Sequence, residues 1–235
     1  MNNKESKRVE TLANWYIDEQ LDFDKRMIRY RYESFSSYFQ GENCLELGPA
    51  DGQMTQFLVN DFKKLTVVEG SLELLNEIPD YDNLTKIHSL FEDYQPDEFF
   101  DAIILEHILE HVEDPISLMK MVKMWLAPGG KLFLGVPNAN SIHRLAAVKM
   151  GLLDKPSQLN SRDISVGHRR VYTHETFKND IIESGLSIQE MGGVFFKPLS
   201  NSQIQNHWDE KMIQGFLELG KDFPEYAAEI FVVCS

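Results

Sequence analysis

The sequence predicts an α/β fold built on a parallel, doubly wound sheet, and three observations carry this prediction. Short apolar segments alternate with amphipathic segments along most of the chain, as in successive βα units. An apolar run at residues 43–47 ends in a glycine-bracketed turn that leads directly into an amphipathic segment. The chain has 235 residues, of which 43% are hydrophobic, so it suits one domain with a full core.

Two amphipathic helices are expected before the first strand, because apolar residues recur at helical spacing over residues 9–39. The aromatic side chains of this segment are Trp15, Tyr16, Phe23, Tyr30, Tyr32, Phe35, Tyr38 and Phe39. We expect residues 1–40 to lie as a helical lid over the end of the sheet where ligands bind, and residues 41–235 to form the α/β domain. Ordinary core packing is the competing interpretation for most of these aromatic side chains.

Five runs rich in β-branched and other apolar residues are expected to be parallel strands. They are residues 43–47, 65–68, 83–88, 100–105 and 131–136. Amphipathic segments follow four of these runs and predict helices at residues 52–60, 71–76, 115–125 and 141–150. The fifth run is introduced by the turn Pro128-Gly129-Gly130.

The pattern changes after residue 150. Residues 151–170 are polar and predict a long loop. Residues 175–184 and 206–220 have helical spacing, whereas residues 186–196 and 229–234 are expected to be extended.

Composition excludes several classes of protein. The net charge is −14 and no basic tract is present, which argues against a nucleic-acid partner because phosphate neutralisation dominates such binding. No apolar run approaches the ~18–20 residues of a membrane span, and the first residues lack the apolar segment of a secretion signal. Cys44 and Cys234 are expected to be buried thiols rather than a disulfide. We therefore expect a cytoplasmic protein, and the sequence leaves its oligomeric state open.

The turn after the first strand has the residues of a nucleotide-binding loop. Residues 45–52 read Leu-Glu-Leu-Gly-Pro-Ala-Asp-Gly. Gly48 permits a sharp backbone turn, and Gly52 lets the next helix begin close to a bound group. The turn therefore predicts a Rossmann-like domain that binds a nucleoside-containing cofactor at this strand end.

The spacing of this loop separates it from the dinucleotide-binding pattern, which would need glycine at Ala50 and at Gln53. It fits instead the pattern acidic-x-Gly-x-(Gly)-x-Gly. Glu46 is the acidic residue, Gly48 and Gly52 are the outer glycines, and Ala50 stands at the middle glycine position. That form resembles motif I of the class I S-adenosylmethionine (SAM)-dependent methyltransferases. The resemblance implies that the cofactor is held by residues of this loop: Glu46, Gly48, Pro49, Ala50 and Gly52.

A second acidic residue follows at the expected distance. The strand at residues 65–68 ends in Glu69-Gly70, and Glu69 lies 21 residues after Gly48. A carboxylate at the tip of the second strand can accept both ribose hydroxyls of an adenosine, so Glu69 and Gly70 are predicted cofactor residues. The competing interpretation is that Glu69 only caps the helix that begins near Ser71.

The turn after the third strand contains Leu90 and Phe91. In methyltransferases this turn lies beside the adenine, and these two side chains supply apolar and aromatic surfaces for the base. Core packing of Phe91 is an equally good interpretation.

The exit of the fourth strand carries the most specific resemblance. Residues 105–115 read Leu-Glu-His-Ile-Leu-Glu-His-Val-Glu-Asp-Pro, which resembles the Leu-Glu-His-Val-x-Asp-Pro signature of a methyltransferase group that includes the ubiquinone-pathway O-methyltransferases. Ala-Pro-Gly-Gly-Lys and Val-Pro-Asn around the fifth strand strengthen it. The resemblance covers nearly everything from residue 43 to residue 235. It implies seven strands in the order 3-2-1-4-5-7-6, with the seventh antiparallel.

Glu106 and His107 are expected at the ligand crevice, because the strands of such sheets end there. Histidine titrates near neutrality, so His107 is the predicted general base that removes a hydroxyl proton as the methyl group arrives. Glu106 is predicted to contact the cofactor.

A metal site is the alternative use of this segment. In the ubiquinone-pathway O-methyltransferases, which act on catechols, a Glu-x-x-Glu-His arrangement at this point can hold a divalent metal. This chain has His107, Glu110 and His111, so histidine replaces the first glutamate. Glu110-His111 recurs in methyltransferases of this group that use no metal. No metal is therefore predicted, and these three residues are the candidates if one is bound.

The acceptor is expected near residues 167–173, Gly-His-Arg-Arg-Val-Tyr-Thr. His168, Arg169 and Arg170 form a compact cationic cluster, and guanidinium groups match phosphate or carboxylate. Pairing with the surplus carboxylates of the chain is the competing interpretation. Asn138 and His143 are expected to border the same cavity.

Phe195-Phe196-Lys197-Pro198-Leu199-Ser200-Asn201 resembles a stretch in uncharacterised bacterial members that are thought to modify surface-polysaccharide precursors. The predicted function is therefore methyl transfer from SAM to an oxygen of a small polar, anionic acceptor, such as a sugar nucleotide, a phosphorylated metabolite or a capsule or polysaccharide precursor.

Three alternatives remain. They are N-methylation of an amino sugar, non-catalytic SAM binding and an NAD-dependent oxidoreductase, which the loop spacing and the strand-four exit disfavour. The Asn/Asp-Pro-Pro-aromatic tetrad usual in DNA and protein N-methyltransferases is absent from the sequence.

Overall fold

The computed structural model describes residues 3–18 and 22–235, with the side chains of residues 4–13 and 22–235. The side chains of Trp15 and Tyr16, which the sequence places in the lid, lie outside the described part. Within it, no helix is both long enough and apolar enough to cross a bilayer.

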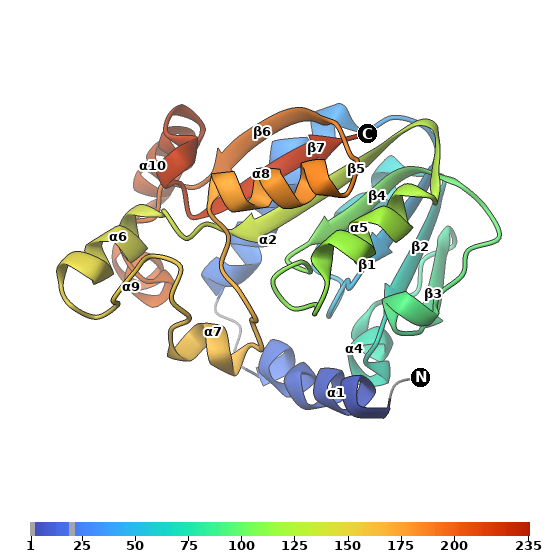
Figure 1. Ribbon diagram of the computed structural model, residues 1–235, viewed down its shortest axis with the longest axis horizontal. Helices are drawn as coiled ribbons and strands as arrows, with labels where there is room; N and C mark the ends of the chain where they lie inside the picture. Colours follow the sequence, from blue (N-terminus) through green and yellow to red (C-terminus); the bar gives the residue numbers. More distant parts are fainter. Residues whose placement is uncertain (1–2, 19–21) are drawn as a thin grey trace.

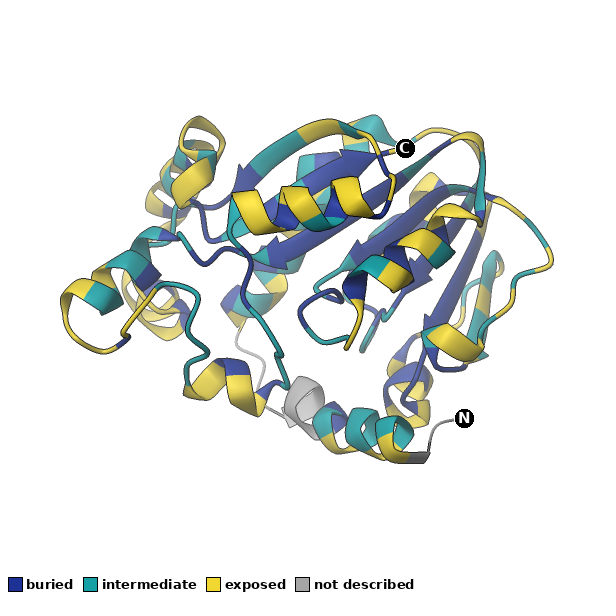
Figure 2. Cartoon of the chain, in the orientation of Figure 1, coloured by how far each residue is buried: buried dark blue, intermediate teal, exposed yellow. Residues whose placement is uncertain are grey.

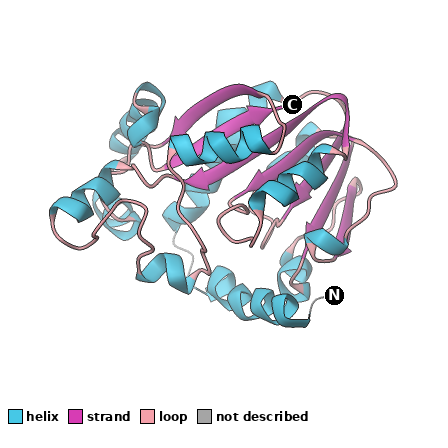
Figure 3. Ribbon diagram, viewed as in Figure 1, coloured by secondary structure: helices cyan, strands magenta, loops and turns pink. Residues whose placement is uncertain are grey.

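A sheet of seven strands forms the centre of the molecule (Figures 1 and 3). In chain order they are β1 (Asn43–Leu47), β2 (Lys64–Glu69), β3 (Leu84–His88), β4 (Phe100–Glu106), β5 (Leu126–Pro137), β6 (Ile188–Val194) and β7 (Glu229–Cys234). Their spatial order is β3-β2-β1-β4-β5-β7-β6, and β7 is antiparallel to both β5 and β6. The predicted fold class, strand order and reversed seventh strand are confirmed.

Helices and short 3-10 turns connect and cover the strands. The helices are α1 (Asn3–Asp18), α2 (Asp22–Phe35), α3 (Thr55–Asp61), α4 (Leu72–Glu77), α5 (Pro115–Lys123), α6 (Ile142–Lys149), α7 (Ser161–Ser165), α8 (His174–Glu183), α9 (Asn201–His207) and α10 (Glu210–Asp222). The 3-10 turns are Ser36–Tyr38, Phe91–Asp93 and Pro224–Tyr226.

The core has a layer on each face of the sheet. On one face, α5 and α8 pack Met119, Val122 and Phe177 against the central strands. On the other, α2 and α3 contribute Phe35 and Leu58. The central strands are dark blue in Figure 2 because both of their faces are covered, which explains why they read as continuous apolar runs in the sequence.

The two N-terminal helices have different positions. Helix α2 belongs to the core, where Phe23 and Met27 are buried in a third cluster with Phe195. Core packing is therefore the right interpretation for Phe23, as it is for Phe35. Helix α1 lies apart from the sheet, along α4 (Figure 1), where the carboxylate of Glu10 accepts hydrogen bonds from Ser71 Oγ and the Leu72 amide.

Three predictions differ from the structure. The turn expected at Pro128-Gly129-Gly130 lies inside β5, which begins at Leu126 and pairs there with Phe100 of β4. The region expected as a loop at residues 151–170 contains α7, which begins with a capping box between Asn160 and Asp163. The helix expected at residues 206–220 begins later, as α10, because Trp208 is extended and the Asp209 carboxylate caps α10 by accepting from the Met212 amide at 2.9 Å; residues 206–207 belong instead to the end of α9, which was not predicted. Cys44 and Cys234 are buried free thiols, as predicted.

Candidate cofactor and acceptor site

The loop after β1 is shaped by residues with left-handed backbone conformations. Gly48 has φ of 65° and Gly52 has φ of 81°, and Ala50 between them has φ of 50°. The Gly48 amide donates to the Val68 carbonyl at 2.9 Å. The positive φ favours glycine at position 48, and a Cβ there would also displace the Cδ1 atom of Ile108, which would lie 2.3 Å away.

Glu69 lies at the tip of β2 with only 5% of its surface exposed. Its two carboxylate oxygens accept hydrogen bonds from the Ser71 amide at 2.9 Å and the Ala50 amide at 3.2 Å. Burial raises the pKa of Glu69, and these backbone donors oppose that effect. An ionised carboxylate can accept about four hydrogen bonds, so Glu69 has capacity left for two hydroxyls in addition to its capping role.

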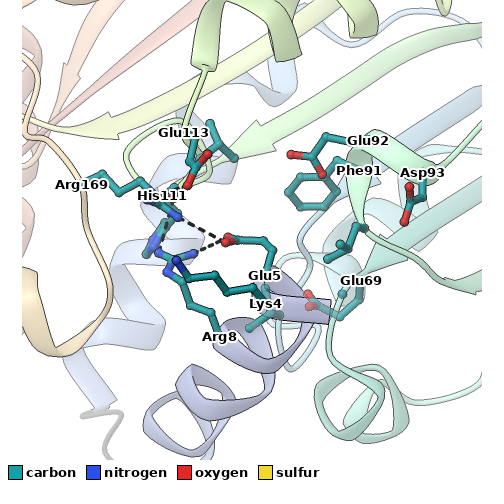
Figure 4. A pocket seen from close by; sticks show the side chains of 14 residues that line it. Lys4, Glu5, Arg8, Glu69, Phe91, Glu92, Asp93, His111, Glu113 and Arg169 are labelled. Atoms are coloured by element: carbon teal, nitrogen blue, oxygen red, sulfur yellow. Dashed lines mark hydrogen bonds and ion pairs between the residues drawn. The ribbon is translucent and has the colours of Figure 1, made fainter. Parts of the chain in front are cut away.

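Two cavities meet at Glu69. The larger has a volume of ≈ 440 Å³, and its lining includes Gly70, Leu90 and Phe91, of which Phe91 is labelled in Figure 4. The smaller, of ≈ 190 Å³, lies over the loop after β1. The predicted cofactor residues that line one or both cavities are Glu46, Gly48, Pro49, Ala50, Glu69, Gly70, Leu90, Phe91 and Glu106. Gly52 lines neither of them; it closes the turn by donating its amide to the Pro49 carbonyl.

Helix α1 supplies a wall to both cavities. Arg8 and Val9 line the two of them, and a Cβ at Gly70 would lie 3.2 Å from Val9. Arg8 donates to the Gly167 carbonyl at 2.6 Å, on the side of the larger cavity opposite Phe91 (Figure 4). The helix thus bridges the β2 end and the loop after α7.

His107 lies between two carboxylates at the exit of β4. Its Nδ1 atom is 3.2 Å from Glu110 Oε1, and its Nε2 atom is 3.5 Å from Glu229 Oε1. Its φ of 54° turns the side chain out of the strand direction, and it lines the smaller cavity. Burial and Arg31 lower the pKa of His107, but Glu229 and Glu110 outweigh them and raise it to about 9.

Arg31 was not predicted from the sequence as a site residue. Its Nε atom lies 3.4 Å from Glu106 Oε2 and its Nη1 atom 3.6 Å from Glu229 Oε1, and it lines the smaller cavity. Its side chain is only 11% exposed, and Nε has no hydrogen-bond partner among the described residues. No sequence signal separates it from Arg26 and Arg29 on the same helix, because only the packing of α2 directs it inward.

The floor of the smaller cavity carries two carboxyl groups with raised pKa values. Burial raises the pKa of Glu46 to about 8, although a hydrogen bond from Thr55 Oγ1 at 2.7 Å acts to lower it. Burial also raises the pKa of Glu106 to about 7, against the nearby charges of Arg31 and His107. A cation bound in this cavity would favour the ionised form of both groups.

The metal candidates are regrouped in the structure. Among the described residues, the three whose donor atoms lie within 4.8 Å of one another are Glu110, His111 and His168, rather than the predicted His107, Glu110 and His111. His168 Nδ1 lies 3.3 Å from Asp163 Oδ1, which would orient its Nε2 atom towards Glu110. These three side chains are therefore the ones that a metal would use.

The predicted acceptor arginines already have partners. Arg170 donates through Nη1 to the Leu109 and Val112 carbonyls, each at 2.6 Å, and it lines neither cavity. Arg169 lines the larger cavity, where its Nε atom donates to the His111 carbonyl and its Nη2 atom lies 3.3 Å from Glu5. This placement favours a structural role for Arg170, which ties the β4–α5 loop to the loop after α7.

The other predicted acceptor residues lie apart from the two cavities. Asn138 is 1% exposed, and its amide nitrogen donates to the Glu225 and Ala227 carbonyls. His168 is held between Asp163 and Glu110. His143, on α6, lies beside Lys197, whose backbone is one of its hydrogen-bond partners. The structure therefore does not gather these residues and the two arginines around one cavity.

Comparison with known proteins identifies the family of this chain. A protein family described as a methyltransferase domain matches residues 19–191. Ubiquinone biosynthesis O-methyltransferase of Aeromonas salmonicida is 28% identical over 107 residues, covering 45% of this chain and 43% of that protein. (S)-coclaurine N-methyltransferase of Papaver somniferum is 30% identical over 132 residues, covering 52% of this chain and 38% of that protein. The matches thus span less than half the length of either relative.

Solved structures show the same fold at low identity. A SAM-dependent methyltransferase of Mesorhizobium loti has a TM-score of 0.63 at 16% identity, covering 87% of this chain and 97% of that one. The N-methyltransferase NodS of Bradyrhizobium japonicum, bound to S-adenosyl-L-homocysteine (SAH), has a TM-score of 0.59 at 19% identity, covering 98% and 96%. The family match, the strand order and the two cavities over the β1 and β2 ends agree, and this chain belongs to the class I SAM-dependent methyltransferases.

Proposed function

We propose that the chain transfers the methyl group of SAM to an oxygen of a small polar acceptor, with His107 as general base. The observation that carries the proposal is the position of His107: it lines the smaller cavity, and its buried Nε2 atom has no hydrogen-bond partner among the described residues. The sulfur–carbon bond breaks as the carbon–oxygen bond forms, the hydroxyl proton passes to Nε2, and SAH leaves. The protein contributes alignment and exclusion of water.

We assign the cofactor to the two joined cavities. The adenine would lie between Leu90 and Phe91 in the larger cavity, and Glu69 would accept the ribose hydroxyls. The methionine part would extend over Gly48 in the smaller cavity, where Arg31 is the cation available for its carboxylate.

The acceptor is proposed to be a small anionic molecule, such as a sugar nucleotide, a phosphorylated metabolite or a polysaccharide precursor, processed in the cytoplasm. The net charge of −14 supports a small molecule over nucleic acid. Residues 1–40 are proposed to act as the lid of this site, with α1 as the part that borders the cavities.

N-methylation of an amino sugar is the second candidate. The carboxylate oxygens of Glu106 and the Oε2 atom of Glu229 are buried without a hydrogen-bond donor among the described residues, and an amine would supply donors to them. Incubation with methyl-labelled SAM and a panel of nucleotide sugars and amino sugars distinguishes the two by mass spectrometry of the product. SAM binding without a methylated product from any acceptor would favour a non-catalytic SAM-binding role.

SAM affinity is expected to rise with pH between about pH 6 and 8, and more weakly up to about pH 9, because a bound sulfonium also lowers the pKa of His107. The sulfonium and ammonium groups favour ionised Glu106 and Glu46, whose pKa values in the free protein are about 7 and 8. Below those values binding must release a proton, and affinity gains up to about tenfold per pH unit for each proton released. Calorimetry in buffers of different ionisation enthalpy measures that release, and Glu106→Gln should reduce it. A pH-independent affinity without proton release would contradict the placement of the cation.

Methyl transfer is expected to be unchanged by excess EDTA, and elemental analysis should find no stoichiometric divalent ion. One carboxylate, Glu110, serves the possible metal cluster, and it already neutralises His107 at 3.2 Å. Arg8 and Arg169 both donate to the His111 carbonyl, so two guanidinium groups lie beside the cluster and disfavour a dication. One bound ion per chain that is lost in His168→Ala, but kept in the exposed-site control His207→Ala, would reverse this conclusion.

A further inference from the structure

Lys197 and His143 are two basic residues at the edge of the sheet where β5 and β6 end. Lys197 follows β6, and His143 lies in the first turn of α6, which follows β5. Strands β5 and β6 end at the same edge, since both are antiparallel to β7. The backbone of Lys197 is a hydrogen-bond partner of the His143 ring, so the two residues lie together.

Among the described residues, the hydrogen-bond partner of the Lys197 ammonium is a neutral side chain. Its Nζ atom donates to Asn201 Oδ1 at 2.9 Å. In the part of the chain that the structure describes, no carboxylate oxygen lies within 4.0 Å of Nζ. The residue is neither fully buried nor fully exposed, and its surroundings limit its hydration. Burial accordingly lowers the pKa of Lys197.

The carboxylates that act on Lys197 from a distance are neutralised by other cations. Asp24 forms an ion pair with Arg162 at 3.0 Å. Glu229 lies 3.6 Å from Arg31 and 3.5 Å from His107. Both acids influence the ammonium electrostatically without pairing with it. Lys197 is therefore a cation for which the described neighbours provide no direct counter-ion.

His143 offers a second contact next to the ammonium. Its Nδ1 atom is buried and has no hydrogen-bond partner among the described residues. Burial, followed by the charges of Lys197 and Arg144, lowers the pKa of His143 to about 3, so the ring is neutral near pH 7. A neutral imidazole has one nitrogen that accepts a hydrogen bond, and the unpartnered Nδ1 atom can accept one from a hydroxyl.

We propose that Lys197 and His143 form an anion-binding subsite, in which the ammonium pairs with a phosphate of the acceptor and His143 Nδ1 accepts from a hydroxyl beside it. This inference rests on the proposed function, because it assigns the reading of an anionic acceptor to these residues. Arg169 and Arg170 are largely occupied by backbone carbonyls and by Glu5, so this pair replaces them as the phosphate contact.

The test measures binding of phosphate probes to SAH-loaded protein by calorimetry. Inorganic phosphate, glucose 6-phosphate and UDP-glucose distinguish a simple phosphate, a sugar phosphate and a sugar nucleotide, and glucose is the neutral control. Lys197→Met should weaken the phosphate probes about tenfold or more, since a hydrogen bond to a charged group is worth about 1.5–3 kcal/mol. Lys178→Met, which removes an exposed lysine of α8, should leave binding unchanged.

If Lys197→Met unfolds the protein, loss of SAH binding will reveal this. Two further variants keep the test decisive in that case. Lys197→Arg should retain phosphate binding within a few-fold, and His143→Asn should weaken glucose 6-phosphate more than inorganic phosphate. Equal phosphate affinity in wild type and the folded variants, or no binding of any probe to the SAH-loaded wild type, overturns the inference. Failure of the wild type to bind SAM or SAH at all would instead refute the proposed function.

Discussion

Replacing His107 with Gln is expected to lower kcat for methyl transfer by about 10²–10⁴-fold and to leave SAM affinity within a few-fold of wild type. The imidazole lines the smaller cavity, whereas the cofactor contacts proposed for Glu69 and Arg31 do not involve it. The exposed residue His207 provides a matched control, since His207→Gln should behave as wild type.

The pH profile separates a base from a structural histidine at position 107. Glu229 and Glu110 raise the pKa of His107 to about 9, against the effects of burial and Arg31. Only the deprotonated imidazole can act as the base, so kcat/KM should rise with pH above neutrality. A bound sulfonium adds positive charge and should lower the pKa of His107 below 9, so the rise should occur at a lower pH when SAM is bound. A His107→Gln variant with near-normal kcat and the same pH profile would exclude His107 as the base.

Glu69→Ala is expected to weaken SAM binding by about 10- to 150-fold, which corresponds to about 1.5–3 kcal/mol. The substitution removes the acceptor for the ribose hydroxyls and the partner of the Ser71 and Ala50 amides. Calorimetry measures the affinity, with Glu73→Ala on the exposed face of α4 as control. If the melting temperature falls while SAM affinity stays the same, Glu69 serves only to cap the start of α4.

The sequence predicted those parts of the site that depend on local structure. Gly48 and Glu69 belong to turns at the ends of adjacent parallel strands, and the sheet brings such turns together whatever the details of packing. The fold class and strand order followed from the same local patterns together with the family resemblance.

Arg31 and Glu229 show what the sequence did not reveal. They come from opposite ends of the chain, and only the packing of α2 and the reversal of β7 bring both to His107 and Glu106. Neither residue lies in a motif, and each is indistinguishable in sequence from exposed charged neighbours. Their identification required the tertiary structure.

The cationic cluster at residues 168–170 shows that a sequence can also suggest a binding site that the structure does not form. Adjacent arginines indicate an anion site only if their guanidinium groups are available. Arg170 instead donates to carbonyls of the β4–α5 loop, whose unpaired backbone oxygens cannot be inferred from the sequence. The metal candidates were regrouped for a similar reason, since the fold brings His168 from the loop after α7 to Glu110, 58 residues earlier in the chain.

The central claim is that the cavities over the β1 and β2 ends bind SAM. Calorimetric titration of the wild-type protein with SAM, and separately with NAD, tests it most directly. We expect one SAM per chain, displaced by SAH, and no binding of NAD. Binding of NAD with no heat from SAM or SAH would contradict the account and would favour a dinucleotide-dependent oxidoreductase on the same sheet.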